Sequence, residues 1–354
     1  MRNGLNITGV SETVHEIRES PAEAVADFAV SAPDVASPPG TVTSRTLTAR
    51  NGTVRMARDF RLTHRLALAP DTPAAPGALA PTPYEAALAS LGACVLVTTV
   101  NGCTARGITL GGISVTVRAE LPLAADGTPA PGRPLEDIGW RCEIDCEAPT
   151  DVLRSVSRLV TAFSPNHRAF LDAAPLTPPL TPGPATAPGD GSCSIEAVVV
   201  WEYGSEAVCR TTLTVGGVRH TAAPFGVDQA KQMLGIDKAP NSQEVLLAAL
   251  SAELSGLLPE VPPGALLAAG RIDTQGMLNI VREVPSSFHR LRLSTTGVPE
   301  SALPGAVTRA VLPATLSTAR PIVVELWHNG VRALRHTSTS EDAEAVRDEL
   351  TNAS

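Results

Sequence analysis

The stretch PTPYEAALASLGACVLVTTV, residues 81–100, decides the fold, because it begins as a helix and then shows no polar face. Thr82 can cap a helix whose first residue is Pro83. Leu88 and Leu91 begin an apolar series at three- and four-residue spacing, which is typical of a helix. Nearly every later side chain in the stretch is small or aliphatic. The sequence therefore predicts a long helix that is buried on most sides.

Cys94 lies at the centre of this helix, and its residue type permits two interpretations. A free cysteine often packs as a small buried hydrophobe. A reactive cysteine must instead be held as a thiolate, and a position about eleven residues into a helix gains little from the helix dipole. A reactive Cys94 therefore needs a nearby cation, and the helix alone leaves both interpretations open.

The composition bounds the architecture and the classes of partner. The 354 residues exceed the usual size of one hydrophobic core, so about two domains are expected. Hydrophobic residues make up 43% of the chain but aromatic residues only 3%, so Ala, Leu, Val and Ile must fill the core. The net charge of −8, without any basic run, argues against nucleic acid or an anionic membrane as partner.

Targeting and cysteine patterns predict a cytoplasmic protein with free thiols. The start, MRNGLNITGV, has no apolar run of signal-peptide length, and no later stretch approaches the ~20 apolar residues of a membrane span. Six cysteines are too sparse for a disulfide framework. Cys142 and Cys146 have C-x3-C spacing, but their segment alternates like a strand, which favours packing over a metal site. No other metal or cofactor motif is found, and no cofactor is predicted.

The chain repeats itself, and the repeat changes the predicted architecture. Residues 81–94 align with residues 240–253 without a gap, and Glu253 then stands where the first copy has Cys94. The identical pairs are Pro81/Pro240, Glu85/Glu244, Leu88/Leu247, Ala89/Ala248, Leu91/Leu250 and Ala93/Ala252. Two buried helices, one per copy, are expected to pack against each other at the centre of a pseudo-twofold pair.

The features that flank the two helices recur in the same order. TLTARNGTVR (46–55) and TLTVGGVRH (212–220) precede them. Each is predicted to form a hairpin, with Asn51-Gly52 or Gly216-Gly217 as its turn. Helical stretches that end near proline follow at 152–165 and 302–313. The sequence thus predicts two copies of one α+β unit.

Proline and glycine content predicts the domain boundaries. PLTPPLTPGPATAPGDGSCS, residues 175–194, cannot continue a helix or a sheet and contains the interdomain linker. The predicted divisions are an N-terminal extension (1–40), a first domain (41–185), the linker (186–194) and a second domain (195–354). A short helix is expected in the extension at SPAEAVADFAV, residues 20–30, with Ser20 as its N-cap.

These motifs resemble the OsmC/Ohr family of cysteine-dependent hydroperoxide reductases, especially its OsmC-like branch. PTPYEAALASLGAC is similar to the family segment NP-x-E-LL-x-A-x-x-A-C, whose cysteine is the peroxidatic thiol on a long central helix. The resemblance implies that Cys94 is that thiol and that Arg50, in ARNG, is the cation that activates it. It also implies that SPNH (164–167) corresponds to the family segment with the resolving cysteine.

The resemblance further implies the assembly. Family members are intertwined homodimers with active sites at the subunit interface, so a tandem copy implies a fused pseudo-dimer that is a monomer in solution. The expected fold is α+β, with two OsmC-like domains packed as a pseudo-twofold dimer. Each domain would be a mainly antiparallel sheet with long buried central helices.

Several positions depart from the family pattern. Ser164 replaces the resolving cysteine, so a disulfide with Cys94 cannot form there. Tyr84 stands where peroxidases of the family have a glutamate, and the neighbouring Glu85 is half a turn out of phase with Cys94 on a regular helix. Tyr84 and Glu85 are candidate substrate-binding residues.

The second copy lacks all three family positions, and it is predicted to be a degenerate, catalytically silent domain. Its residues at the positions of Arg50, Cys94 and Ser164 are Val215, Glu253 and Leu312. His167 and Glu253 remain candidates for a base or proton donor at the Cys94 site. The alternatives are a capping or solvated histidine and an acid at the seam between the helices.

Three functions remain open from the sequence. The leading hypothesis is a one-cysteine thiol peroxidase, in which Cys94 attacks an organic hydroperoxide and an external low-molecular-weight thiol reduces the resulting sulfenic acid. The second is the hydrolysis or conversion of a small metabolite, with Cys94 as nucleophile or acid/base and His167 or Glu253 moving the proton. The third is a binding or regulatory protein without turnover. The apolar surroundings of Cys94 favour a small organic partner over a phosphorylated one.

Overall fold

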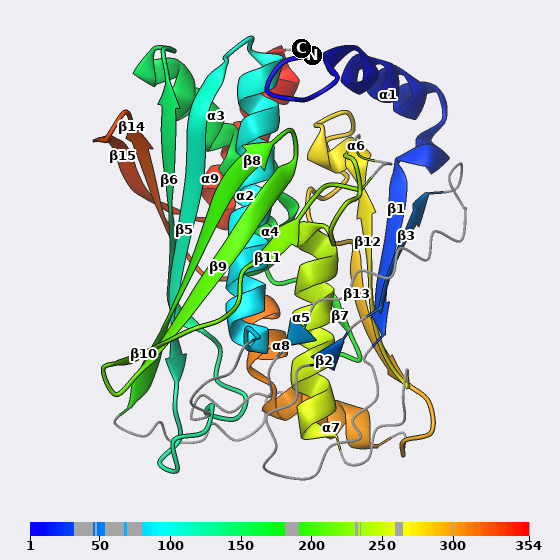
Figure 1. Cartoon of the computed structure of the whole chain (residues 1–354). Coiled ribbons are helices and arrows are strands. Elements are labelled where there is room, and N and C mark those ends of the chain that lie inside the picture. The colour runs from blue at the N-terminus through cyan, green and yellow to red at the C-terminus, as the bar shows by residue number, and fades with distance from the viewer. Residues whose placement is uncertain are drawn as a thin grey trace.

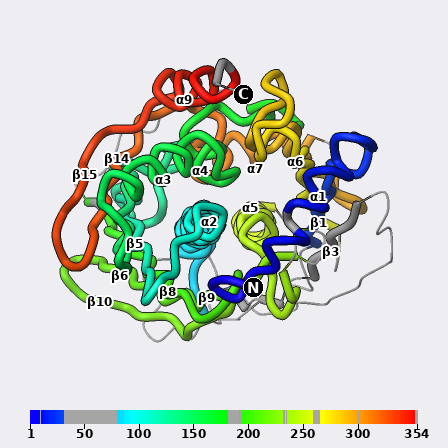
Figure 2. The backbone as a smooth tube through the Cα atoms, turned by 90° about the horizontal axis from the view of Figure 1, so that it is seen from above, coloured from blue at the N-terminus to red at the C-terminus, as the bar shows by residue number. Residues whose placement is uncertain are grey.

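The fold is a pair of central helices enclosed by two sheets (Figure 1). α2 (Pro83–Ala105) and α5 (Ser242–Leu257) lie side by side at the centre when the molecule is seen from above (Figure 2). The prediction that these two helices meet is therefore confirmed. The computed structural model describes residues 1–31, 45–46, 48–53, 67–68, 80–180, 191–230, 233, 235–258, 265–299 and 301–353.

Both central helices begin with the same capping box. The Thr82 hydroxyl accepts a hydrogen bond from the Glu85 amide, and the Glu85 carboxylate accepts one from the Thr82 amide. Asn241 and Glu244 repeat this exchange at the start of α5. The glutamate that both helices carry at this position therefore fixes the point at which each helix begins.

The larger sheet packs against α2. Within the described residues it has eight strands in the order β10-β9-β8-β5-β6-β14-β15, with β11 paired to β9. Their bounds are β5 (Leu110–Pro122), β6 (Glu136–Cys146), β8 (Ser192–Tyr203), β9 (Glu206–Val215), β10 (Val218–Thr221), β11 (Phe225–Val227), β14 (Ile322–His328) and β15 (Val331–Ser338).

The smaller sheet packs against α5. Its described strands follow the order β3-β1-β12-β13-β7. Their bounds are β1 (Val25–Ser31), β3 (Thr48–Thr53), β7 (Leu176–Thr177), β12 (Leu266–Asp273) and β13 (Arg290–Thr295). A separate pair is formed by β2 (Arg45–Thr46) and β4 (Ala67–Leu68).

The two sheets share one pattern of strand directions. Along β3-β1-β12-β13-β7 the pairings are antiparallel three times and then parallel. Along β9-β8-β5-β6-β14 the same succession occurs. Both sheets also combine strands that precede residue 186 with strands that follow residue 194, so the two halves of the chain are interlaced.

Smaller helices cover the open sides of the central pair. The predicted helix at 152–165 is α3 (Thr150–Phe163), and after a break at Ser164 the chain continues as α4 (Pro165–Leu171). The predicted helix at 302–313 is likewise broken, at Ala310. The remaining described helices are α1 (Ile7–Glu19), η1 (Pro21–Ala24), α6 (Thr274–Met277), α7 (Ala302–Arg309), α8 (Val311–Leu316) and α9 (Ser340–Ala353).

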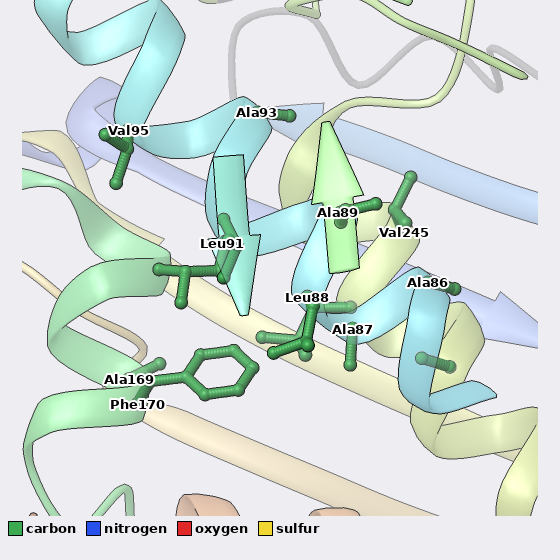
Figure 3. Close-up of a cluster of buried hydrophobic side chains, with 14 of the residues drawn as sticks. Ala86, Ala87, Leu88, Ala89, Leu91, Ala93, Val95, Ala169, Phe170 and Val245 are labelled. Atoms are coloured by element: carbon green, nitrogen blue, oxygen red, sulfur yellow. The ribbon is translucent and has the colours of Figure 1, made fainter. Parts of the chain in front are cut away.

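The burial of α2 follows from its small side chains. Gly92 lets the sheet approach closely, because a Cβ atom there would stand 2.9 Å from the Cγ2 atoms of Val117 and Val199. On another face, Leu88 and Leu91 join a buried cluster with Phe170 of α4 (Figure 3). Among the described helices α2 alone is long and apolar enough to cross a bilayer, but most of it is buried in this fold. Its hydropathy is therefore that of a core helix.

Two local predictions in the N-terminal part are wrong. The segment 20–30 is not a helix beyond its first turn, which is η1, because Ala26, Phe28 and Val30 alternate into the core as β1. A period of two is typical of a strand, and pairing with the neighbouring strand β12 stabilises this strand.

The predicted hairpin turn at Asn51-Gly52 is also wrong. Both residues lie within β3, opposite Phe28 and Asp27 of β1. The hairpin at Gly216-Gly217 is confirmed, with φ angles of +55° and +82° between β9 and β10. Pairing with β1 thus overrides the turn preference of Asn51-Gly52. Nothing in the described fold opposes the turn preference of Gly216-Gly217.

Candidate active site

Cys94 lies in the middle of α2 and is only 3% exposed. Its Sγ atom receives hydrogen bonds from the Ser164 hydroxyl at 3.2 Å and the Asn166 backbone amide at 3.4 Å. A third comes from the Gln243 side-chain amide at 3.5 Å. Of the residues predicted for the site, the structure therefore brings Ser164 to Cys94, and it adds Asn166 and Gln243.

The break between α3 and α4 places two of these donors. Ser164 has an extended backbone, which ends α3, and Pro165 then begins α4 because its fixed φ suits a first helical position. The Asn166 side chain donates to the Ser90 carbonyl at 3.2 Å and to the Ser242 carbonyl at 2.9 Å. Asn166 therefore ties α4 to both central helices and fixes the wall around Sγ.

The third donor comes from the start of α5. Gln243 is the second residue of that helix, and its side-chain amide also donates to the side-chain oxygen Oδ1 of Asn166 at 3.4 Å. The capping box of Asn241 and Glu244 fixes the backbone at this point. The site is thus assembled at the interface between the two central helices, from residues about 150 positions apart in sequence.

Burial and hydrogen bonding act in opposite directions on the Cys94 thiol. Burial raises its pKa, and hydrogen bonds from Ser164, Asn166, Ser242 and Gln243 lower it to a smaller extent. None of these partners carries a positive charge. The predicted cation, Arg50, lies in β3 opposite Ala29, and its side chain is outside the described part of the structure.

A cavity of about 100 Å³ adjoins Cys94. Its wall is largely apolar and includes Val97, Phe163 and Pro165, with Gln243 and Asn101 supplying amide groups. A small organic molecule can approach Sγ from this side. No group of three or more His, Cys, Asp or Glu side chains among the described residues has the geometry to hold a metal ion.

Glu253 does not belong to the Cys94 site. Its carboxylate accepts hydrogen bonds from the backbone amides of Val311 at 2.6 Å and Leu312 at 2.9 Å, and from the Tyr84 hydroxyl at 3.3 Å. Tyr84 lies ten residues before Cys94, which is about 15 Å along α2. Burial raises the pKa of Glu253 to about 7. Tyr84 and Glu253 therefore form a second buried cluster, apart from the thiol.

The ring of His167 contacts residues other than Cys94. Its Nδ1 atom accepts a hydrogen bond from the Trp140 indole at 3.1 Å, and its Nε2 atom lies 3.4 Å from the Ser338 hydroxyl. Burial lowers the pKa of His167 to about 3, so the ring is neutral. The histidine fills the core beneath α4, and these contacts do not place it to move a proton at Sγ.

Glu85, the other predicted substrate-binding residue, caps α2. Burial raises its pKa, which its hydrogen bonds to Thr82 partly offset. A signal for this role is present in the sequence, because Thr-x-x-Glu and Asn-x-x-Glu before an apolar run are capping boxes. For Gln243 the available signal is its alignment with Tyr84 in the repeat.

Comparison with known proteins supports the resemblance for the part of the chain that contains Cys94. Residues 75–178 match the family model of the OsmC-like protein. The matched range includes α2, α3 and α4, and therefore Cys94, Ser164 and Asn166. A search of curated proteins gave no match. The chain thus contains an OsmC-like domain, which fits a family of cysteine-based thiol peroxidases in broad terms.

Proposed function

We propose that the protein is a one-cysteine thiol peroxidase of OsmC type that reduces organic hydroperoxides. The observation that carries the proposal is the surroundings of Cys94 Sγ: donors from α5 and from the start of α4 converge on it, and a mostly apolar cavity adjoins it. Donors that point at a sulfur stabilise the thiolate relative to the thiol. The apolar wall suits the organic part of the substrate.

In the proposed reaction the Cys94 thiolate attacks the distal oxygen of the hydroperoxide. The S–O bond forms while the O–O bond breaks, and the alkoxide takes up a proton and leaves as the alcohol. Sulfur is oxidised to sulfenic acid and the peroxide is reduced. Ser164 and Gln243 hold the sulfur in line with the cavity during this step.

An external thiol completes the cycle. Ser164 stands 3.2 Å from Sγ, in the position expected for a resolving group, but a hydroxyl cannot form a disulfide. A low-molecular-weight thiol would therefore condense with the sulfenic acid, releasing water and leaving a mixed disulfide. A second thiol then attacks that disulfide and returns Cys94 to the thiol state.

Arg50 is proposed as the positive charge that the thiolate requires. Its strand, β3, packs beside α5, whose first turn faces Cys94. A guanidinium group lowers the pKa of a nearby thiol and can orient an incoming oxygen. The proposal needs this contribution, since burial outweighs the hydrogen bonds of the described neighbours.

We also propose that the second half of the chain is a degenerate tandem copy of the first. The shared succession of strand directions and the paired capping boxes support this. The break of α7 and α8 at Ala310 corresponds to the break at Ser164, so Leu312 occupies the place of Asn166 rather than that of Ser164. The proposed pseudo-dimer is a cytoplasmic monomer.

Intact mass spectrometry after one equivalent of cumene hydroperoxide tests the proposed function. We expect a rapid gain of one oxygen in the native protein and none in the Cys94→Ser variant, whose thiol is replaced by an isosteric hydroxyl. A Cys103→Ser variant, on the same helix, is the matched control and should still gain the oxygen. An oxygen gain that does not depend on Cys94 would remove the proposal.

A binding protein without turnover is the second candidate, and the raised pKa of the buried Cys94 thiol favours it. Cys94-dependent oxidation without consumption of thiol in the steady state would support this alternative. The hydrolytic hypothesis has less support, since His167 contacts Trp140 and Ser338, and Glu253 contacts Tyr84.

A further inference from the structure

A second cavity, of about 270 Å³, lies beside the Cys94 cavity and beneath the N-terminal helix. α1, η1, the end of α2 and the short helix α6 form its walls. Its lining includes Leu5, Ile17, Ala24, Ala26 and Met277. Glu23 supplies a carboxylate and several residues supply hydroxyl or amide groups, but most of the exposed wall is apolar. Such a wall favours a neutral aliphatic group.

The two cavities share part of their lining. The residues common to both are Asn101, Gln229, Met233, Met277 and Leu278. One face of α2 runs through both, because Cys94, Thr98, Asn101 and Ala105 recur at spacings of four, three and four residues. Asn101 lies seven positions after Cys94, which is about 10 Å of helix. The shared residues form the boundary between the two cavities, and an elongated ligand that reaches from Sγ into the larger cavity would pass across it.

Two amide side chains lie at the boundary between the cavities. Asn101 and Gln229 line both, are partly exposed, and make no side-chain hydrogen bond within the described part of the chain. Amide groups left free in this way can bind a neutral polar group such as a carbonyl or hydroxyl. At the outer edge Ile7 is 40% exposed and Leu278 39% exposed, so the apolar wall continues to the surface.

We propose that the cavity beneath α1 is an alkyl-binding site. Its occupant is the aliphatic chain of a neutral, medium-length substrate whose polar group meets Asn101 and Gln229 and whose reactive group meets Cys94. An apolar cavity of 150 Å³ accommodates benzene, so by scaling this one holds roughly ten carbon atoms. The inference rests on the proposed function only for the reactive group, because binding of the chain does not require a thiol.

Direct binding to the Cys94→Ser protein tests the site without covalent chemistry. Isothermal titration with butanamide, hexanamide and octanamide should show Kd falling roughly fourfold for each added methylene, the value expected for full burial of CH2. The apparent Tm should rise in the same order. No binding, or a Kd that does not change with chain length, would overturn the proposal.

Filling the cavity identifies where the chain lies. Ala105 is exposed and lines the larger cavity, so Ala105→Trp should remove the gain in affinity from butanamide to octanamide without disturbing the core. Arg106→Trp is the matched control, because Arg106 is exposed, adjacent and not part of the lining. If both tryptophans had equal effects, the site would lie elsewhere. Thr13→Trp, on α1, provides a second filled variant should Ala105→Trp not fold.

A thiol-directed series connects the cavity to Cys94. In an alkyl methanethiosulfonate the Cys94 thiolate attacks the sulfenyl sulfur, a disulfide forms, and methanesulfinate leaves. The octyl reagent should react at least tenfold faster than the methyl reagent in the native protein. In Ala105→Trp the two reagents should react at the same rate. A fast octyl reaction together with no oxygen gain from cumene hydroperoxide would exclude the peroxidase and retain the alkyl site. Oxygen gain together with equal octyl and methyl rates would exclude the alkyl site and retain the peroxidase.

Discussion

Cys94 and Glu253 occupy matching places in the two halves of the molecule. Each lies on a central helix, next to the break between two shorter helices and opposite the start of the other central helix. The backbone amide two residues after the break donates to Sγ at 3.4 Å in one case and to a carboxylate oxygen at 2.9 Å in the other. The second residue of the opposite helix, Gln243 or Tyr84, donates as well.

The difference lies in what each set of donors surrounds. Sγ holds longer contacts and borders a cavity, whereas both carboxylate oxygens of Glu253 are engaged by short hydrogen bonds from the backbone. A frame of donors that suits a reactive thiolate therefore also suits a fixed carboxylate. One copy of the frame serves chemistry, in our proposal, and the other joins α5 to α8 and α2.

Loss of the thiol is the change with the largest expected effect. Cys94→Ala should lower the rate of hydroperoxide reduction at least about a thousandfold, since removal of a nucleophile eliminates the covalent step. Consumption of dithiothreitol in the presence of cumene hydroperoxide measures that rate. Cys103→Ala, which also removes a buried thiol from α2, should retain activity. Equal losses in the two variants would mean that the effect comes from packing.

Loss of the carboxylate should instead affect stability. Glu253→Ala leaves two backbone amides and the Tyr84 hydroxyl without their acceptor, and we expect a loss of about 4 kcal/mol in the free energy of unfolding. Urea unfolding followed by circular dichroism measures it. Cys94 alkylation should keep its rate at temperatures where the variant is folded. If Glu253→Ala kept its stability but its Cys94 were alkylated slowly, the assignment of stability to Glu253 and reactivity to Cys94 would be wrong.

Glu253 also makes stability depend on pH in a known direction. Its pKa is raised to about 7 in the folded protein, so the folded state holds a proton that the unfolded state releases near pH 4.5. The stabilising contribution is complete below about pH 4.5 and is lost as the pH rises through about 7. The total change is about 3 kcal/mol at most.

Comparison with Glu253→Gln isolates this contribution, because Gln does not titrate. His167, with its pKa lowered to about 3, has the opposite effect and cancels in the difference. We expect the difference in unfolding free energy between native protein and Glu253→Gln to fall from pH 4.5 to pH 8. A difference independent of pH would show that Glu253 is ionised throughout.

The smallest effects are expected at the donor to Sγ. Ser164→Ala removes one hydrogen bond and should slow Cys94 alkylation at neutral pH roughly fivefold, which corresponds to about 1 kcal/mol. Ser164→Cys should change the product instead, because its thiol would lie within reach of the sulfenic acid. After one equivalent of peroxide its mass should fall by two hydrogens. A stable gain of oxygen in Ser164→Cys would contradict the close contact between residue 164 and Cys94 Sγ.

The sequence predicted the elements whose periodicity is strong and local. The buried helix at 83–103, the helix at 242–258 and the Gly216-Gly217 hairpin are present because their own residues suffice to specify them. The segment predicted as a helix at 20–30 is mostly a strand. Ser20 and Pro21 are residue types typical of a helix start, but the alternating burial of Ala26 and Phe28 suits a strand that pairs with β12.

The candidate site was less predictable, because its residues meet only through packing. Family resemblance selects Cys94 and Ser164, but Asn166 contacts the site through its backbone amide, which any residue would supply. Gln243 comes from the other half of the chain. The placements of His167 and Glu253 depend on the neighbours Trp140 and Val311, which no spacing rule connects to them.

The measurement that tests the central claim most directly is the pH dependence of Cys94 alkylation, resolved from the other five thiols by peptide mass spectrometry. Hydrogen bonds from neutral donors do not overcome burial at Cys94, so our proposal requires the charge of Arg50 for a reactive thiol. We predict a midpoint below about 8.5 in the native protein. In Arg50→Ala it should rise by about one pH unit or more, and in the control Arg45→Ala it should not change. An unchanged profile in Arg50→Ala, or a native Cys94 that resists alkylation up to about pH 9, would show that the thiol is structural.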